Sequence, residues 1–181
     1  MVKTRVVRTV EVPDLLRISR YRKIPELGPR VLFFSGGSAL NKTSRVLKDF
    51  THNSIHFFTP FDSGGSSATL RKAFNMPSIG DLRIRLMALA DENITGHPDV
   101  YQLFTYRLPH DMNNDELLKQ LDSMIRGKGA LISNISNPMR RLIRNQLGYF
   151  RDAMPANFDL RGASVGNLIL AGGYLNNHKH L

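Results

Sequence analysis

Cysteine is absent from the 181 residues of this chain. Disulfide bonds, zinc sites built on thiolates and cysteine nucleophiles are therefore excluded. A chain without disulfides is typical of a reducing compartment, so a cytoplasmic location is expected. No apolar run approaches the roughly 20 residues that cross a bilayer, and the first residues lack the apolar stretch of a secretory signal. Neither a membrane partner nor export is expected.

Acidic residues are too few to balance the basic ones. The 25 Lys and Arg against 15 Asp and Glu give a formal net charge of +10. An excess of this size favours an anionic partner, such as a nucleotide, a phosphorylated metabolite or a nucleic acid. Part of the charge lies in residues 1–29, which we predict to be a basic N-terminal extension. Residues 30–181 are predicted to form one α/β domain.

Small residues are concentrated between a predicted strand at 55–59 and a predicted helix that begins near residue 66. Gly64 and Gly65 would let the backbone approach a phosphate, because no Cβ stands in the way. The N–H groups of the first helical turn would point at the anion. Ser66 and Ser67 can cap the helix or donate hydroxyls to a ligand. A capped turn without a ligand is the alternative interpretation.

Asp62 opens this small-residue stretch. An ionised carboxylate cannot donate a hydrogen bond to phosphate. Its expected roles are contact with magnesium, contact with a ribose hydroxyl, or orientation of the loop.

A second small-residue loop follows an earlier apolar run. Residues 30–35 are predicted to form a strand buried on both faces of a parallel sheet, and Gly36, Gly37 and Ser38 come directly after it. The loops of neighbouring parallel strands both lie at the carboxyl edge of the sheet, where ligands bind. The two loops are therefore expected to face one shared ligand site.

Two further polar residues stand at predicted helix starts. Asp81 stands at the start of a helix that is predicted to end near residue 91. At this start it can serve as the helix cap. Asn167 lies in an otherwise apolar segment, and a buried asparagine must find partners, so a ligand contact is a candidate role. Gly166 beside it is costly in a helix unless a ligand or another backbone comes close. Farther along the chain, Asn113 or Asn114 is predicted to cap a helix, and Asn137 another.

These segments occur in the order and spacing of the CofD-like superfamily, and the chain resembles that group over about residues 29–174. The resemblance rests on the residues around Gly36, Asp62, Asp81 and Asn167. The group contains 2-phospho-L-lactate transferase and gluconeogenesis-factor-like proteins that bind nucleotide sugars. The sequence around Asp62 is most similar to a CofD-related branch found in gene neighbourhoods with ATP-grasp-type proteins.

The resemblance implies a Rossmann-like fold with a mainly parallel sheet and helices on both faces. It implies a nucleoside diphosphate conjugate as substrate or ligand, with magnesium as cofactor on Asp62. The implied catalytic residues are Asp62 and Asp81. The implied cofactor-binding residues are Gly36, Gly37, Ser38, Gly64, Gly65, Ser66, Ser67 and Asn167.

The chain departs from the family pattern in three places. Ser38-Ala39 stands where the family usually has Thr-Gly, and Ala163 stands where the nucleotide-sugar-binding branch has histidine. The chain also ends soon after the last motif, whereas family members continue, so a domain incomplete at its C-terminus is expected. A homodimer is one way in which such a domain would be completed.

Three functions remain open from the sequence. The first is a transferase that moves a phospho-linked group from a nucleoside diphosphate conjugate to an acceptor hydroxyl. The second is a regulator that binds nucleotide sugars without catalysis. The third is a basic nucleic-acid-binding protein, which the lack of a dense basic and aromatic pattern disfavours.

Overall fold

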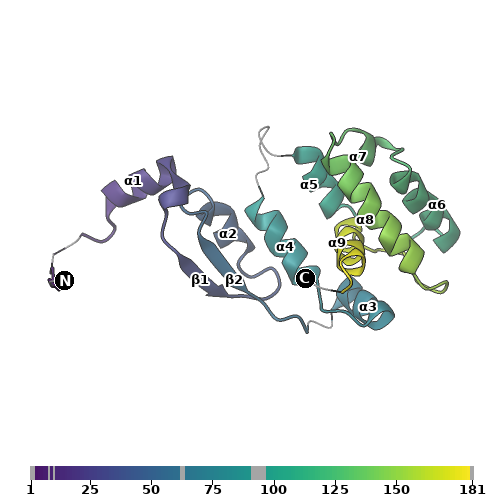
Figure 1. Ribbon diagram of the computed structural model, residues 1–181, viewed down its shortest axis with the longest axis horizontal. Helices are drawn as coiled ribbons and strands as arrows, with labels where there is room; N and C mark the ends of the chain where they lie inside the picture. The colour runs from purple at the N-terminus through teal and green to yellow at the C-terminus, as the bar shows by residue number, and fades with distance from the viewer. Residues whose placement is uncertain (1–2, 8, 10, 62–63, 91–96, 180–181) are drawn as a thin grey trace.

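The computed structural model describes residues 3–7, 9, 11–61, 64–90 and 97–179, and it is elongated (Figure 1). A small α/β part lies between the N-terminal segment and a larger helical body. The N-terminal segment holds α1 (Leu15–Lys23) and the 3₁₀ turn η1 (Pro25–Leu27). The remaining elements are β1 (Val31–Phe34), α2 (Asn41–Leu47), β2 (Ser54–Phe57), α3 (Gly65–Phe74), α4 (Gly80–Leu89), α5 (Pro98–Thr105), α6 (Asn114–Ile125), α7 (Ala130–Ser133), α8 (Met139–Ala153) and α9 (Val165–Asn176).

The two strands form a parallel pair joined through α2. Their register runs from Val31 opposite Ser54 to Phe34 opposite Phe57. This βαβ unit confirms the prediction of an α/β chain with parallel strands. The predicted larger parallel sheet is not found among the described residues, which contribute only two strands and are mostly helical.

One face of this sheet is open, which corrects the prediction that the strand at residues 30–35 is buried on both faces. Leu32, Phe34, Ile55 and Phe57 point outward and are 48%, 83%, 48% and 57% exposed. The rings of Phe34 and Phe57 stack with centroids 5.7 Å apart. Val31, Phe33, Ser54 and His56 alternate with them and are partly buried. Within the described residues, helices cover the inner face alone, so a continuous apolar run did not mean burial on both sides.

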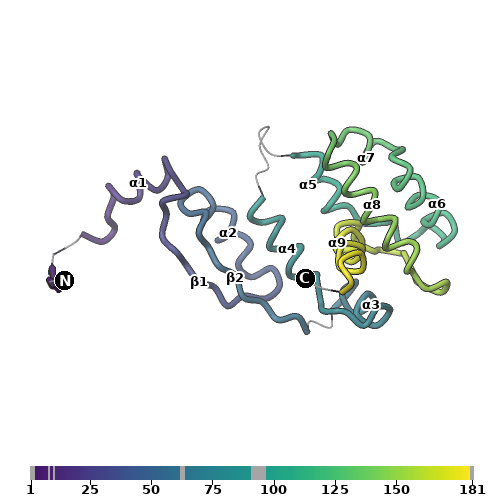
Figure 2. Tube along the Cα trace, in the orientation of Figure 1, coloured from purple at the N-terminus to yellow at the C-terminus, as the bar shows by residue number. Residues whose placement is uncertain are grey.

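The main core lies in the helical body, where α9 is central (Figure 2). Phe74, Phe150 and Phe158 meet there in edge-on or tilted contacts, with ring centroids 5.5–6.1 Å apart. Helices α8 and α9 approach closely at Gly172. A Cβ at that position would overlap the backbone carbonyl oxygen of Gln146 on α8. The glycine therefore sets the distance between the two helices.

Helix α6 begins with a capping box. Asn113 Oδ1 accepts from the Glu116 N–H at 2.9 Å, and the Glu116 carboxylate accepts from the Asn113 N–H at 3.2 Å. Of the two predicted caps, Asn113 is thus the cap residue, and Asn114 is the first residue of the helix. The predicted cap at Asn137 is wrong, because Pro138 is the N-cap residue of α8 and no side chain bonds there.

We expect Asn113→Ala to lower the free energy of unfolding by about 1 kcal/mol, since a side-chain acceptor is lost from the α6 start. Asn113→Asp should keep the parent stability, because aspartate caps as well as asparagine does. Urea denaturation of the three proteins measures both effects. Equal stability of all three would show that the box contributes nothing.

Among the described residues, no helix combines the length and the apolar character needed to cross a membrane.

Candidate functional site

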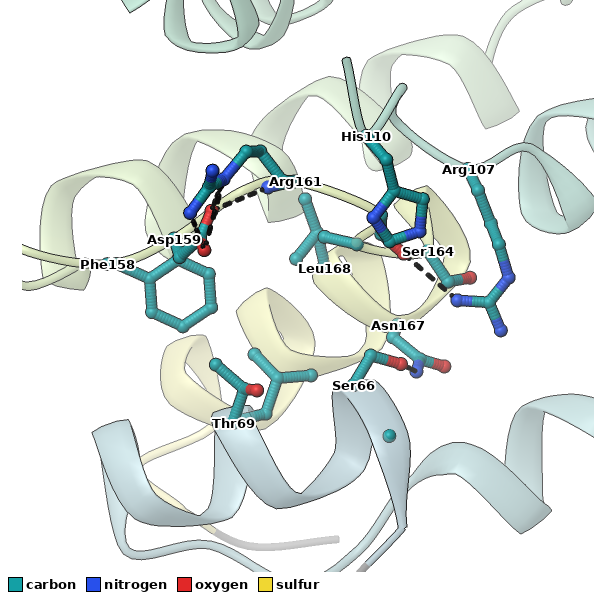
Figure 3. Close-up of a pocket in the computed structure, with 14 residues that line it drawn as sticks. Ser66, Thr69, Arg107, His110, Phe158, Asp159, Arg161, Ser164, Asn167 and Leu168 are labelled. Carbon is teal, nitrogen blue, oxygen red and sulfur yellow. Dashed lines mark hydrogen bonds and ion pairs between the residues drawn. The ribbon is translucent and has the colours of Figure 1, made fainter. Parts of the chain in front are cut away.

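A pocket of about 340 Å³ lies where the N-termini of α3 and α9 meet (Figure 3). We call it the α3–α9 pocket. Residues of α3 form one side, and the segment that leads into α9 forms the other. The lining residues are Gly65, Ser66, Thr69, Leu70, Arg107, His110, Phe158, Asp159, Arg161, Gly162, Ala163, Ser164, Asn167 and Leu168.

The α3 start reaches the pocket through a glycine with a positive φ. Gly65 has φ +49°, a backbone conformation that residues with a Cβ rarely adopt. No neighbouring atom lies within 4 Å of the position that a Cβ would take there. Its predecessor Gly64 is the N-cap residue and provides no side-chain oxygen for the first-turn amides. The space beside Gly65 therefore lets a ligand approach the first turn of α3.

The α9 start contributes a buried hydroxyl. Ser164 is the N-cap residue of α9, makes no side-chain capping bond and is 0% exposed. Among the residues that the structure describes, its Oγ has no hydrogen-bond partner. The Val165 N–H is already used, since it donates to the Tyr106 carbonyl at 3.0 Å. A buried hydroxyl without a partner is unfavourable unless a ligand or water satisfies it.

A chain of hydrogen bonds joins the two helix starts. The buried Arg83 on α4 donates from Nε to Asn167 Oδ1 at 2.8 Å, and Asn167 Nδ2 donates to Ser66 Oγ at 2.9 Å. Because a guanidinium can only donate, it fixes the orientation of the Asn167 amide. Ser66 Oγ acts as the acceptor in this chain, which leaves its own proton available for a ligand. The arrangement prepares Ser66 to donate into the pocket.

Positive charge gathers at the same place. Burial, and to a lesser extent the positive charge of Arg107, lowers the pKa of Arg83. Arg107 lies at the pocket wall and donates from Nη1 to the Gly162 carbonyl at 3.0 Å. His110 packs against Gly162, whose φ of +66° turns the chain there. These groups favour an anion in the α3–α9 pocket.

The rim carries a balanced ion pair. Arg161 Nη2 lies 2.9 Å from Asp159 Oδ2, and both side chains are about half exposed. Hydrogen bonds from Arg161 lower the pKa of the Asp159 carboxyl. Asn114 holds this rim segment in place, accepting from the Leu160 N–H and donating to the Phe158 carbonyl, each at 2.9 Å. The rim is thus positioned by α6 and adds little net charge.

The predicted site residues divide between this pocket and the carboxyl edge of the sheet. Gly65, Ser66 and Asn167 line the α3–α9 pocket. Ser67 is buried instead against Gly80 of α4, where a Cβ would overlap its Oγ. Gly64 precedes the pocket as the α3 N-cap residue.

The other predicted loop lies outside the pocket lining. Gly36, Gly37 and Ser38 follow β1 and do not line the α3–α9 pocket. Asp62, the predicted metal contact, lies outside the described residues, as does its neighbour at position 63. The prediction that both loops hold one shared diphosphate therefore stays a prediction.

Asp81 lies between the two loops. Its Oδ2 is 3.6 Å from the position that a Cβ of Gly36 would take, and the preceding Gly80 contacts Ser67 of α3. The residue occupies the first turn of α4 without acting as its cap, because Ile79 is the N-cap residue. Only 8% of Asp81 is exposed, and within the described residues no hydrogen bond reaches its carboxylate.

A buried carboxylate of this kind is a suitable oxygen ligand for magnesium. Magnesium is commonly held by one or two carboxylates together with substrate phosphates, and not by a complete protein cage. The described part of the chain contains no group of three histidine or acidic residues that could hold a metal by itself. Asp81 therefore fits a cation that is shared with a phosphate ligand.

Sequence reasoning missed Arg83, Arg107, His110, Asn114 and Ser164 as parts of this region. Arg83 comes two residues after Asp81, but its residue type and position gave no sign that it reaches Asn167. Ser164 is one of several small residues before α9, and nothing in the sequence marks its hydroxyl as buried. The spacing of 84 residues between Arg83 and Asn167, and of 101 between Ser66 and Asn167, explains why local patterns gave no signal.

A known protein family matches most of the chain. Residues 31–178 match the family model described as 2-phospho-L-lactate transferase CofD. An uncharacterized protein of Saccharomyces cerevisiae is 27% identical over 157 residues, which are 80% of this chain and 33% of the relative.

Two bacterial relatives are named gluconeogenesis factor. That of Halalkalibacterium halodurans is 39% identical over 77 residues, which are 42% of this chain and 23% of the relative. That of Bacillus subtilis is 37% identical over 79 residues, which are 44% of this chain and 24% of the relative. The chain spans a third or less of the length of these relatives. No solved structure matches it.

Proposed function

The chain belongs to the CofD family, and from that premise we propose that it binds a nucleoside diphosphate conjugate and transfers a phospho-linked group to an acceptor hydroxyl. The description of the family as a 2-phospho-L-lactate transferase supports this class of reaction. The α3–α9 pocket would receive phosphate, and the loop of Gly36, Gly37 and Ser38 would receive another part of the same ligand.

One observation carries the proposal: two helix N-termini converge on one pocket and are linked by the Ser66–Asn167 hydrogen bond. Each helix start favours negative charge through its amides and its dipole. Ser66 has a proton to donate, and Arg107 adds positive charge at the wall. A diphosphate has the charge and the acceptor oxygens that this combination would bind.

The transfer needs positioning more than a protein nucleophile. The oxygen of the acceptor hydroxyl forms a bond to phosphorus, and the bond from phosphorus to the departing nucleoside monophosphate breaks. The hydroxyl proton passes to a base, for which the carboxylates of Asp81 and Asp62 are the candidates. The helix amides and Ser66 would hold the phosphate oxygens while charge moves to the leaving group.

Magnesium would be held by Asp81 and Asp62 together with phosphate oxygens of the ligand. When bound, magnesium would neutralise part of the negative charge of the diphosphate. The protein residues still determine where the ligand lies.

Chelation of magnesium and the substitution Asp62→Asn are each expected to weaken binding of the conjugate about tenfold. The two changes should not add, because both remove the same interaction. Isothermal titration calorimetry of parent and variant, with magnesium or with a chelator, gives the four affinities. Additive losses would mean that Asp62 acts separately from the metal.

Regulation without catalysis is the second candidate, and the gluconeogenesis-factor relatives favour it. Incubation with magnesium, an acceptor hydroxyl and a nucleoside diphosphate conjugate separates the two functions. Release of nucleoside monophosphate supports the transferase. Saturable binding without release supports the regulator. Affinity that falls steeply with salt and does not distinguish nucleotides would contradict both and indicate nucleic-acid binding.

A further inference from the structure

The outer side of helix α8 faces solvent, and the proposed reaction does not use it. On the inner side, Ile143, Leu147 and Phe150 are buried in the helical body. Residues 138, 141, 142, 145, 149 and 152 fall on the other side, because 3.6 residues make one helical turn, and all six are exposed. We call these six residues, together with Gly148, the α8 face.

One edge of the α8 face is apolar and borders a groove. Leu142 is 52% exposed, and Tyr149, about two turns later, is 48% exposed. A groove of about 770 Å³ lies along the N-terminal half of the helix, and its lining includes Met139 and Leu142. Single exposed apolar residues need no explanation, but two that share one helix face beside a groove indicate a contact surface.

The other edge carries opposite charges around a glycine. Arg141 lies near the start of α8, Asp152 lies near its end, and Gly148 stands between them. Within the described part of the chain, neither charged side chain takes part in an ion pair. No atom lies within 4 Å of the position that a Cβ of Gly148 would take. Glycine is unfavourable inside a helix relative to alanine, and no contact among the described residues requires it here.

The apolar edge is self-complementary when two copies of α8 pair antiparallel. With a two-fold axis beside Asn145, Leu142 of one copy stands at the level of Tyr149 of the other and on the same side of the line of contact. That tyrosine also lies at the level of the groove, so its ring can fill the groove. Two-fold symmetry makes the same contact twice, once toward each end of the pair.

The charged edge matches in the same arrangement. Arg141 crosses the second copy at Gly148, where the missing Cβ leaves room for the arginine side chain. Asp152 of the second copy lies three residues farther on, about 4.5 Å along the helix axis, within reach of the guanidinium. A parallel pair would instead place Arg141 beside Arg141 and Asp152 beside Asp152, and these like charges would repel.

We propose that the α8 face binds a second copy of this chain and forms a two-fold dimer. The charge complementarity of Arg141 and Asp152 favours a second copy over an unrelated partner, because one face supplies both members of the pair. A single pair of helices buries less area than a standard protein interface, so the dimer is expected to be weak. No residue of the α8 face lines the α3–α9 pocket, so the proposal stands without the transferase function.

Sedimentation velocity at micromolar to millimolar protein concentrations, in buffer of physiological salt, measures the association. The parent chain should shift reversibly from monomer to dimer as its concentration rises. Arg141→Glu and Asp152→Arg should each weaken the association about tenfold or more, because each turns both attractive pairs of the dimer into repulsive ones. Lys42→Glu, at an exposed position of α2, makes the same change of charge as Arg141→Glu and should keep the parent association.

An equimolar mixture of Arg141→Glu and Asp152→Arg tests the pairing itself. Each variant alone brings like charges together, whereas in a mixed dimer each introduced charge meets an opposite one. The mixture should therefore recover the parent association, which a merely structural role of either side chain could not produce. A parent chain that stays monomeric at every concentration, or a mixture that does so, would overturn the proposal.

Association through the open face of the sheet is the competing explanation, and Phe34→Ser separates the two. Phe34 is 83% exposed, so its replacement should keep the fold. If the copies meet at the α8 face, Phe34→Ser should dimerise like the parent chain. Loss of the dimer in Phe34→Ser, with its persistence in Arg141→Glu, would place the contact at the sheet and refute an α8 dimer.

Discussion

An alanine at Gly172 is expected to lower the free energy of unfolding by roughly 3 kcal/mol, or to prevent folding of the helical body. The added Cβ would overlap the Gln146 carbonyl oxygen on α8, and that atom belongs to the backbone of a packed helix. No side-chain rotation can relieve such a contact. Helices α8 and α9 would have to separate, and this would loosen the core around Phe150.

Gly173→Ala is the matched control, one residue later on the same helix. Its Cβ would lie 3.7 Å from Gln146 Oε1, an ordinary contact. Replacing glycine by alanine inside a helix should therefore raise the stability by up to about 1 kcal/mol. Urea denaturation of both variants measures the contrast. If Gly172→Ala unfolded at the parent urea concentration, the close approach of α8 and α9 would be wrong.

Asn167→Ala is expected to weaken binding of a nucleoside diphosphate conjugate by about 100-fold. The change removes the acceptor of the buried Arg83 Nε and the donor that orients Ser66. A buried donor left without its partner costs about 1–3 kcal/mol, and each 1.4 kcal/mol is about tenfold in affinity. The stability should fall as well, because Arg83 remains buried.

Asn167→Asp separates binding from stability. Its carboxylate can still accept from Arg83, so the fold should keep the parent Tm. It cannot donate to Ser66, and it places negative charge beside the anion pocket, so binding should fall at least as far as in the alanine variant. Asn145→Ala, on the exposed side of α8, should change neither property. Calorimetric titration gives the affinities, and unimpaired binding by Asn167→Asp would contradict a phosphate at this place.

Local patterns predicted the elements that carry the site. The glycines and serines at 64–67 do begin a helix at the end of a βα connection, although the cap is Gly64 and not a serine. Gly166 does meet another backbone, since its Cβ position lies 2.5 Å from the Phe104 carbonyl oxygen. Asn167 does find partners, but they are Arg83 and Ser66. These predictions succeeded because each depends on one residue type in one local conformation.

The assembly of the pocket depends on packing between distant segments, which local patterns do not report. Arg107 and His110 look like ordinary surface residues in the sequence, and Asn114 looks like a helix cap. All three become part of the pocket region only because residues 158–164 fold back beside them. The open sheet face was missed for a related reason. An apolar run indicates a strand, but it does not say whether a neighbour covers each side.

The outward side chains of Leu32, Phe34, Ile55 and Phe57 also bear on how the isolated polypeptide behaves in solution. They form an exposed apolar patch on a strongly cationic molecule. Electrostatic repulsion between positively charged chains would keep them apart in dilute buffer. Added salt would screen this repulsion and allow the apolar patches to associate. The ionic strength chosen for storage would therefore decide between a clear preparation and a turbid one.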